Sequence, residues 1–309
     1  MVKVFIDGSA GTTGLRIHKR LEKRDDITLI SLCDSDRKDK TQRKKALNSA
    51  DIAFLCLPDE AAMESVSLVD NPDTIIIDAS TAHRTDPDWT YGLLELGDEV
   101  YSKVKNSKRI CIPGCHATGF ISLVEPLIEN GIVCKDYPFS CFSLTGYSGG
   151  GKSMINQYQD KNRDASLSSP RIYALTQKHK HLNEMKLYSN ISEYPLFNPV
   201  VLDIYSMMCV TVNISAKEVK LDEVQKAYTK KYANRPLFDV SDISAQSYNG
   251  FIPSDAFKDK DSIKITVTGN DERISLIALY DNLGKGASGA AIQIFNVITG
   301  NKETKGLNI

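Results

Sequence analysis

The stretch VKVFIDGSAGTTG, residues 2–14, decides the fold of the first part of the chain. The segment VKVFI is short, apolar and β-prone, so it predicts a buried strand. Gly8, Gly11 and Gly14 follow at a regular spacing of three, and an apolar pattern over 15–21 then predicts a helix. A strand, a glycine turn and a helix in this order are typical of a dinucleotide site.

Glycines in such a turn let the backbone approach a pyrophosphate, and the N-terminus of the helix supplies N–H donors and a favourable dipole. We therefore expect Gly8, Gly11, Thr12, Thr13 and Gly14 to bind the cofactor. A tight structural turn would use the same glycines, and the flanking strand and helix favour the dinucleotide site.

A second apolar segment, 27–32, leads to a polar stretch where the adenosine ribose of a dinucleotide lies in such folds. Acidic residues there usually bind the ribose hydroxyls of NAD, whereas basic residues accommodate the 2′-phosphate of NADP. This chain has Asp34 and Asp36 beside Arg37 and Lys38. The local sequence therefore leaves the cofactor open, and a solvated loop would carry the same charges.

Apolar β-prone segments recur at 51–58, 74–80 and 109–113, and the stretches between them are compatible with helices. This alternation predicts an α/β fold with a parallel, doubly wound sheet. Arg84 follows the segment 74–80 and lies at the carboxyl end of the predicted sheet, where ligands of such folds bind. Arg84 is a candidate for binding phosphate or carboxylate, although many arginines are only surface charges.

Cys115 lies between the predicted strand 109–113 and a helix with apolar residues at helical spacing from Phe120 to Ile128. The N–H groups at a helix N-terminus favour a thiolate, and they can lower a cysteine pKa from about 8.5 to ~3.5–7.5. The same N–H groups can stabilise an oxyanion. A buried core thiol is the alternative, but the position at a turn favours a nucleophile.

The chain has seven cysteines, an odd number, and most of them lie in apolar segments. They predict reduced thiols in the core and no disulfide framework. Cys111, Cys115 and His116 lack the paired spacing of a zinc site, so no metal is expected.

The composition is that of a globular chain large enough for two domains, with 309 residues, 41% hydrophobic, 25% charged and a net charge of −1. This charge gives no indication of nucleic-acid binding. The first residues lack the basic and apolar regions of a signal peptide, and no apolar run reaches the ~18 residues of a membrane span. We therefore expect a cytoplasmic protein without a membrane partner.

After Cys115 the β-rich segments FSCFSLTG, VLDIYSMMCVTVNI, SIKITVTG and RISLIALYD predict a mostly antiparallel sheet. The segment 147–152 reads as a flexible, anion-friendly loop. His179 and His181 lie beside Glu184 and suit acid–base chemistry with a thiol, although a metal site or a polar loop would use the same residues. A terminal helix through Ile292, Phe295 and Ile298 ends the pattern.

Seven segments in this order span residues 6–291: IDGSAGTTG, LNSADIAFLCLPD, DASTAHR, PGCHATG, GYSGGGK, HKHLNEM and DNLGKGASGAA. Together they resemble the N-acetyl-gamma-glutamyl-phosphate reductase family, in particular its shorter subtype. The resemblance implies an arginine-biosynthetic enzyme that uses NADPH to reduce N-acetyl-gamma-glutamyl phosphate to N-acetylglutamate semialdehyde and releases phosphate.

The resemblance also implies roles for individual residues. It makes Cys115 the nucleophile and His179 the acid–base residue, and it assigns His181 and Arg84 to the substrate carboxylate or phosphate. The remaining positions are Ser148 in the substrate site, Gly149 in the loop beside the nicotinamide, Asn282 near its carboxamide, and Arg37 or Lys38 near the 2′-phosphate. The chain departs from the family's pattern at two positions: His116 stands where tyrosine is more frequent in the family, and Asn183 where proline is common.

The implied architecture has two domains, as in glyceraldehyde-phosphate dehydrogenase. We expect a Rossmann domain at 1–114, completed by the C-terminal helix in 282–309, and an α+β catalytic and oligomerisation domain at 115–281. A wide sheet face in the second domain suits a homodimer or homotetramer. The alternatives are another acyl-phosphate reductase such as aspartate-semialdehyde dehydrogenase, a non-catalytic NADP-sensing regulator, and a cysteine hydrolase that binds no dinucleotide.

Overall fold

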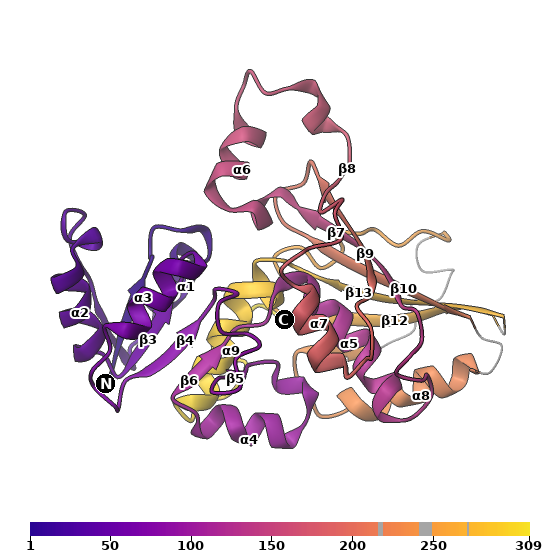
Figure 1. Ribbon diagram of the computed structural model, residues 1–309, viewed down its shortest axis with the longest axis horizontal. Coiled ribbons are helices and arrows are strands. Elements are labelled where there is room, and N and C mark those ends of the chain that lie inside the picture. Colours follow the sequence, from indigo (N-terminus) through magenta and orange to yellow (C-terminus); the bar gives the residue numbers. More distant parts are fainter. Residues whose placement is uncertain (216–218, 241–248, 271) are drawn as a thin grey trace. The chain divides into compact units, whose positions relative to one another are not determined.

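The computed structural model describes residues 1–215, 219–240, 249–270 and 272–309, which form two compact units. Unit 1 comprises Met1–Leu94, Asp98–Pro113 and Ala290–Gly306, and unit 2 comprises Glu95–Gly97, Gly114–Gly289 and Leu307–Ile309. Each unit is built around a sheet of its own (Figure 1).

Unit 1 contains a six-stranded sheet in the order β2-β1-β3-β4-β6-β5, and all neighbouring strands are parallel. The strands are β1 (Val2–Asp7), β2 (Ile27–Ile30), β3 (Ile52–Leu55), β4 (Ile75–Asp78), β5 (Thr90–Tyr91) and β6 (Arg109–Cys111). The connecting helices are α1 (Thr12–Leu21), α2 (Lys40–Ser49), α3 (Asp59–Ser67) and α4 (Asp98–Asn106), with 3₁₀ turns at Asp36–Lys38 and Leu94–Leu96. The predicted parallel, doubly wound sheet is confirmed.

Four strands of unit 1, β2, β3, β4 and β6, end two or three residues earlier than the sequence predicted, with β2 ending at Ile30 and β3 at Leu55. Apolar residues continue beyond these ends because they lie in the turns that lead to the next helix, where Pro58 is the N-cap of α3. The predicted helix is confirmed as α1, in which Ile17 and Leu21 form the buried face and Leu15 is 44% exposed.

The C-terminal helix α9 (Gly289–Ile298) completes unit 1. Its Phe295 ring lies 6.0 Å from the ring of Phe54 on β3, and Ile294 packs against Gly92 so closely that a Cβ there would come within 2.5 Å of its Cδ1. The last helix is therefore part of the core of the N-terminal sheet.

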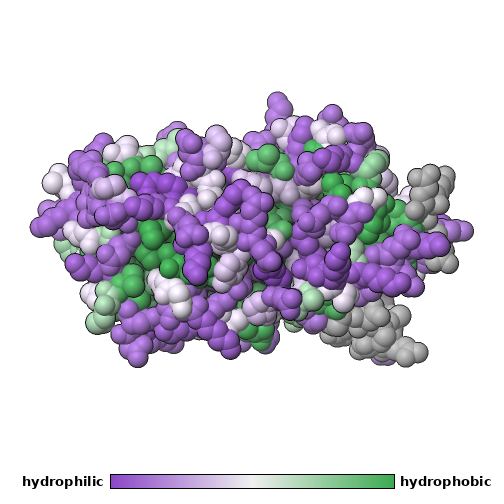
Figure 2. Space-filling model, turned by 90° about the horizontal axis from the view of Figure 1, so that it is seen from below, coloured by the Kyte–Doolittle hydropathy of each residue, from purple (hydrophilic) through white to green (hydrophobic). Residues whose placement is uncertain are grey.

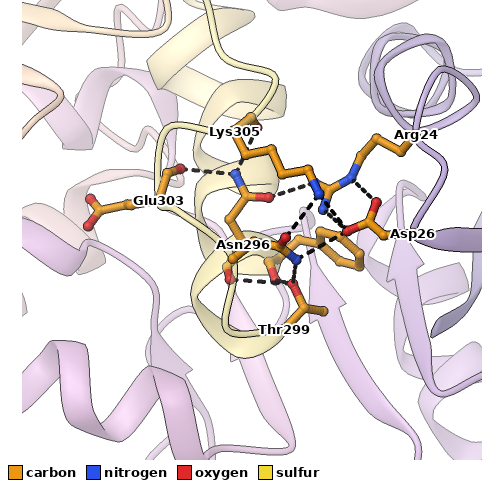
Figure 3. A network of polar contacts seen from close by, with 8 residues as sticks. Arg24, Asp26, Asn296, Thr299, Glu303 and Lys305 are labelled. Carbon is orange, nitrogen blue, oxygen red and sulfur yellow. Dashed lines mark hydrogen bonds and ion pairs between the residues drawn. The ribbon is translucent and has the colours of Figure 1, made fainter. Parts of the chain in front are cut away.

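A polar network fixes the segment after α9 to the loop before β2 (Figure 3). The Arg24 guanidinium donates to both oxygens of the Asp26 carboxylate, at 2.8 and 2.6 Å, and to Asn296 Oδ1 at 2.6 Å. Lys305 Nζ donates to Asp26 Oδ2 at 2.9 Å. The hydrogen bonds from Arg24, with a further contribution from Lys305, hold the pKa of the Asp26 carboxyl far below its ordinary value, although burial opposes the shift.

Unit 2 contains a seven-stranded sheet in the order β11-β12-β13-β10-β7-β9-β8. Among the described strands, the pairs β11–β12 and β7–β9 are parallel and the other neighbours are antiparallel, as predicted for most of this sheet. The strands are β7 (Ser140–Gly146), β8 (Arg171–Ile172), β9 (Leu196–Leu202), β10 (Met208–Ser215), β11 (Phe238–Val240), β12 (Ile263–Gly269) and β13 (Arg273–Tyr280).

Helix α5 (Cys115–Glu129) lies on this sheet, packed against β10 and β13 and beside α7 (Leu182–Ser189) and α8 (Leu221–Tyr232) (Figure 1). Gly119 allows the close approach, since a Cβ there would come within 2.6 Å of the Tyr280 hydroxyl and of Val210. The remaining helices in the described part of the unit are the 3₁₀ helices η3 (Tyr147–Gly150) and η4 (Ala165–Ser168), α6 (Gly151–Gln159) and the π-helix η5 (Gly284–Ser288).

The segment 147–152 is helical, so the prediction of a flexible loop was wrong. Tyr147 is buried, and its ring stacks on that of Tyr158 at a centroid distance of 4.5 Å. Gly151 has a φ of +70°, which side-chain-bearing residues rarely adopt, and it joins η3 to α6. The glycines therefore serve a turn between two ordered helices.

All seven cysteines are free thiols. Cys111 and Cys141 are buried, but Cys33 and Cys134 are exposed, which corrects the prediction that they belong to the core. Both follow the end of a regular element, where the chain turns at the surface. The face seen in Figure 2 is largely hydrophilic, with hydrophobic residues interspersed in small areas. Every helix in the described ranges is too short or too polar to span a membrane.

Candidate active site

Cys115 is the first residue of α5, as predicted from the turn that contains it. The N-cap, Gly114, has no side-chain cap of its own, and its N–H donates to Glu184 Oε2 on α7 at 2.9 Å. The carbonyl of Cys115 accepts a hydrogen bond from the Tyr280 hydroxyl, which also accepts from the N–H of Gly119 at 3.0 Å. These contacts fix the first turn of α5, whose N–H groups carry partial positive charge.

The π-helix η5 packs directly on Cys115, since a Cβ at Gly286 would come within 3.0 Å of the cysteine Cβ. Lys285 in this helix donates to Glu95 Oε1 at 2.7 Å, and both side chains are only 1% exposed. Asp281 accepts the N–H groups of Leu283 and Gly284 at 2.7 and 2.9 Å. The backbone of η5, which packs on Cys115, is therefore fixed both by the Lys285–Glu95 pair and by the Asp281 carboxylate.

The two predicted histidines, His179 and His181, lie together against His116, which follows Cys115. The His179 ring centroid is 4.7 Å from that of His181 and 5.5 Å from that of His116. The backbone N–H of His181 donates to His179 Nδ1 at 3.2 Å, which favours a neutral His179 with its proton on Nε2. His181 is buried, and its Nε2 lies 4.0 Å from Glu184 Oε1.

Sequence reasoning named His116 only as a departure from the family pattern that could alter the environment of the thiol, and the structure places it at the centre of this cluster. Its side chain is 2% exposed, and its ring contacts that of Phe197 edge-on at 5.2 Å. Nδ1 lies 2.6 Å from Ser143 Oγ and Nε2 lies 2.6 Å from the Tyr173 hydroxyl. Burial, with a smaller contribution from His179, lowers the pKa of His116 to about 3, so the imidazole is neutral.

Ser148 and Asn282 are hydrogen-bonded to each other. Asn282 Nδ2 donates to Ser148 Oγ at 3.0 Å, and its Oδ1 accepts the N–H of Met207 at 3.0 Å. Gly149 follows in η3, where a Cβ would be 3.6 Å from Asn282 Nδ2. The structure thus brings together Ser148, which the sequence analysis assigned to the substrate, and Gly149 and Asn282, which it assigned to the nicotinamide.

The glycine turn of unit 1 is formed by close packing of the chain on itself. Gly8 has a φ of +85°, and a Cβ there would be 2.3 Å from the Cys56 carbonyl oxygen, while one at Gly14 would be 2.4 Å from the Gly8 oxygen. Gly11 is the N-cap of α1 and receives no side-chain cap, and the buried Thr12 Oγ1 has no partner among the described residues. Uncapped donors at a helix start and an unpaired buried hydroxyl fit a phosphate group.

Arg37 and Lys38 lie after β2, where the ribose was expected, and both are exposed. Arg37 Nη1 pairs with Asp34 Oδ1 at 2.9 Å. Of the mixed charges that left the cofactor open in the sequence, Asp34 and Arg37 are thus paired with each other on the surface of unit 1.

Arg84 is 7% exposed, so it is not an ordinary surface arginine. Its Nη2 donates to the Ala79 carbonyl at 3.1 Å. The turn before it is held by Asp78, which lies 2.7 Å from His83 Nδ1 and accepts from Ser80 Oγ at 2.6 Å. The His83 ring stacks on Trp89 at 4.1 Å. A turn fixed in this way holds Arg84 at the carboxyl end of β4.

Within the residues that the structure describes, no three His, Cys, Asp or Glu side chains are grouped as metal ligands.

Comparisons with known proteins agree across nearly the whole chain. Residues 3–104 match the semialdehyde dehydrogenase NAD binding domain, and residues 115–282 match the semialdehyde dehydrogenase dimerisation domain. Proteins of Brucella ovis and Brucella suis, both named N-acetyl-gamma-glutamyl-phosphate reductase, are 40% identical over 306 residues, which cover 96% of this chain and 99% of theirs.

Solved structures agree in fold. Aspartate semialdehyde dehydrogenase from Francisella tularensis superposes with a TM-score of 0.73 at 15% identity and covers 97% of this chain and 100% of its own. Aspartate semialdehyde dehydrogenase II from Vibrio cholerae, complexed with ASA, gives 0.71 at 15% identity over 97% and 98%. These likenesses support the fold, and the closer sequence relatives define the branch. The chain belongs to the semialdehyde dehydrogenase family, and within it to the N-acetyl-gamma-glutamyl-phosphate reductases.

Proposed function

We propose that this chain reduces N-acetyl-gamma-glutamyl phosphate with NADPH to N-acetylglutamate semialdehyde and phosphate, a step of arginine biosynthesis. The proposal rests on two observations. Cys115 lies at the start of α5, and the imidazoles of His179 and His181 cluster around that of His116, the next residue in the chain. The named relatives at 40% identity support the choice of substrate.

In the proposed reaction the Cys115 thiolate attacks the acyl carbonyl and the C–O bond to phosphate breaks. The product is a thioester on Cys115 and inorganic phosphate. Uncapped N–H groups of the first turn of α5 can stabilise the oxyanion of this step. NADPH would supply the hydride that reduces the thioester. The carbonyl then re-forms as the proton on its oxygen returns to His179, the C–S bond breaks with its electron pair restoring the Cys115 thiolate, and the semialdehyde leaves.

His179 is proposed as the acid–base residue. Because Nδ1 accepts the His181 N–H, the imidazole proton lies on Nε2, from which it can be donated to the acyl oxygen as negative charge develops there. A donor fixed by a backbone hydrogen bond does not need to reorganise during the reaction. Catalysis of this kind contributes typically ~10²–10⁴-fold.

We assign the cofactor to residues 1–114 with the C-terminal helix, and catalysis and self-association to 115–281. The phosphates would lie on Gly8, Gly11, Thr12, Thr13 and Gly14. The nicotinamide would lie at Gly149 and Asn282, and the 2′-phosphate at Arg37 or Lys38. An aspartate semialdehyde dehydrogenase from Candida albicans has been solved with NADP, and that likeness, at 13% identity, bears on the fold alone.

Three residues are proposed to bind the substrate. The buried guanidinium of Arg84 can form paired, charge-assisted hydrogen bonds to phosphate or carboxylate. His181 and Ser148 provide further polar contacts, and the Ser148 hydroxyl is already oriented by Asn282.

We also propose that the chain forms a homo-oligomer of two or four copies through the sheet of unit 2. The strand face opposite α5 carries Phe142, Ile172 and Leu196, which are 48%, 56% and 61% exposed. Exposed hydrophobic side chains on one sheet face are typical of a protein interface. Phe142→Asp should lower the mass measured by analytical ultracentrifugation, and an unchanged mass would place the interface elsewhere.

The function is tested in the reverse direction, with N-acetylglutamate semialdehyde, NADP and phosphate, by following the absorbance of NADPH. Aspartate semialdehyde in a parallel assay tests the related reductase, and Cys115→Ser tests whether the chain is catalytic at all. We expect phosphate-dependent NADPH formation with the N-acetylated substrate and none with Cys115→Ser. Turnover by the serine variant would refute the thiol mechanism, and a preference for aspartate semialdehyde would refute the substrate.

A further inference from the structure

Strand β8 ends at Ile172, but the chain after it still pairs with β9. The N–H of Tyr173 donates to the Pro199 carbonyl at 3.1 Å. In the antiparallel register of these two strands, the next hydrogen-bonded pair would join Leu175 to Phe197. Instead the backbone leaves the ladder at this point, and the Leu175 side chain is 78% exposed.

The side chain of Gln177 supplies the missing pair. Its Nε2 donates to the Phe197 carbonyl at 2.8 Å, and its Oε1 accepts the Phe197 N–H, also at 2.8 Å. Two paired residues of an antiparallel ladder exchange the same two hydrogen bonds through their backbones. The primary amide of glutamine carries a donor and an acceptor side by side, so it can replace a backbone residue there. Gln177 therefore continues the pairing with β9 through its side chain.

The backbone between β8 and this pair has an unusual conformation. Ala174 and Gln177 have φ values of +53° and +55°, in the left-handed region that residues other than glycine adopt uncommonly. The N–H of Gln177 donates to the Ala174 carbonyl at 2.9 Å and closes the turn. Such conformations persist only where surrounding contacts hold them. The two hydrogen bonds to Phe197 are contacts of this kind, two residues before His179.

Phe197 links the side-chain pair to the histidine cluster. Its side chain is 1% exposed, and its ring contacts those of His179 and His116 edge-on, at centroid distances of 5.1 and 5.2 Å. On the other side, His179 Nδ1 accepts the His181 N–H. Phe197 thus binds the chain just before His179 through its backbone and packs on the imidazole through its ring.

We propose that Gln177 is a positioning residue for His179. Its side-chain pair with Phe197 fixes the segment that carries the imidazole, and so holds His179 in the orientation that keeps its Nδ1 on the His181 N–H. This inference rests on the proposed acid–base role of His179. Gln177 acts through His179 and is not itself catalytic. Because Gln177 lies at the surface, its substitution leaves no buried cavity.

The first test follows the structure without substrate or cofactor, by hydrogen–deuterium exchange with peptide mass spectrometry. Gln177→Met keeps the length of the side chain and removes both hydrogen bonds to Phe197. Exchange at the N–H groups of Phe197 and His181 should become roughly tenfold faster, because two neutral hydrogen bonds are lost at a partly exposed position. Gln159→Met, the same substitution at the exposed last residue of α6, is the matched control and should change neither.

A second variant separates the side chain from the backbone conformation. In Gln177→Asn the new residue adopts the left-handed region more readily than most, but its side chain is one methylene too short to form both hydrogen bonds. Gln177→Asn should therefore behave as Gln177→Met does, and it replaces that variant if thermal unfolding shows that Gln177→Met does not fold. Wild-type exchange at His181 in Gln177→Asn would overturn the inference, because the backbone conformation alone would then fix the segment.

The kinetic test uses the reverse reaction. Gln177→Met should lower kcat roughly tenfold to a hundredfold, the cost of a misplacement of up to ~1 Å, with KM for NADP unchanged. In a His179→Asn background the same substitution should have no further effect on kcat, because Gln177 acts only through that imidazole. An undiminished kcat in Gln177→Met, or a further loss in the double variant, would overturn the inference.

Failure of the proposed function has a different signature. Absence of reductase activity in the wild-type chain, or wild-type kcat in His179→Asn, would refute the reaction or the acid–base role. Faster exchange at His181 in Gln177→Met would still show that Gln177 positions His179. Conversely, unchanged exchange at His181 would refute the positioning in a fully active enzyme.

Discussion

Asp26→Asn should destabilise unit 1 selectively. Asp26 accepts hydrogen bonds from Arg24 and Lys305, and hydrogen bonds to charged groups contribute ~1.5–3 kcal/mol each. The Asp26 side chain is 30% exposed, which reduces this contribution through solvent screening, and asparagine keeps one acceptor oxygen. The expected loss is therefore about 2 kcal/mol in the free energy of unfolding.

The chain supplies its own reporter for this measurement. Its only tryptophan, Trp89, belongs to unit 1 and stacks on His83, so urea unfolding followed by its fluorescence reports on that unit. Asp73→Asn is the matched control. It breaks a surface pair with Lys108 in which Asp73 is 85% exposed, and solvent screening leaves such pairs little effect on stability.

The pH dependence provides a second check. The folded pKa of Asp26 lies below its unfolded value, so its contribution is fully present above about pH 4 and is lost as the pH falls toward the folded pKa. The difference between wild type and Asp26→Asn should shrink below pH 4. A difference no larger than that of Asp73→Asn, or one that persists unchanged at pH 3, would refute the role given to this network.

Three further predictions concern the reaction. His179→Asn should lower kcat by roughly 10²–10⁴-fold in steady-state assays, and a larger loss in His181→Asn would exchange the two assignments. Replacing Arg37 and Lys38 by Ala should raise KM for NADPH far more than for NADH, whereas equal effects would leave both side chains as solvated surface. Arg84→Lys should lower kcat/KM roughly tenfold to a hundredfold with cofactor affinity unchanged, and a raised KM for phosphate in the reverse reaction would assign Arg84 to the leaving group.

The elements that the sequence predicted well are those with local signals. Residues 2–21 contain a strand, a turn with Gly8 and Gly11, and a helix, in the predicted order. Cys115 begins a helix, as the helical spacing of the apolar residues after it predicted. The parallel sheet was predicted from the regular alternation of strands and helices. Errors at the strand ends arose because apolar residues also line the buried turns, which hydropathy does not distinguish from strands.

The contacts that complete the site were not predictable because they join residues distant in sequence. The Gly114 N–H reaches Glu184, and His116 reaches Tyr173, over separations of 70 and 57 residues. Similarly, the segment 147–152 is helical because Tyr147 stacks on Tyr158, a packing effect that overrides the glycine signal. The residue types indicated a thiol and histidines, and only the tertiary structure identified the two hydroxyls that pair with His116.

The path of the chain has a consequence for synthesis on the ribosome. Unit 1 takes its first residues from the N-terminus but its closing helix from Ala290–Gly306, after Gly114–Gly289 has been made as part of unit 2. At ~5–20 residues per second, the roughly 180 intervening residues take about 10–35 s to translate. During this time the nascent sheet lacks Phe295 over Phe54 and presents an uncovered apolar face, the kind of surface that chaperones bind. The reductase therefore cannot mature domain by domain from its N-terminus, and a premature stop before residue 290 leaves its first domain unfinished.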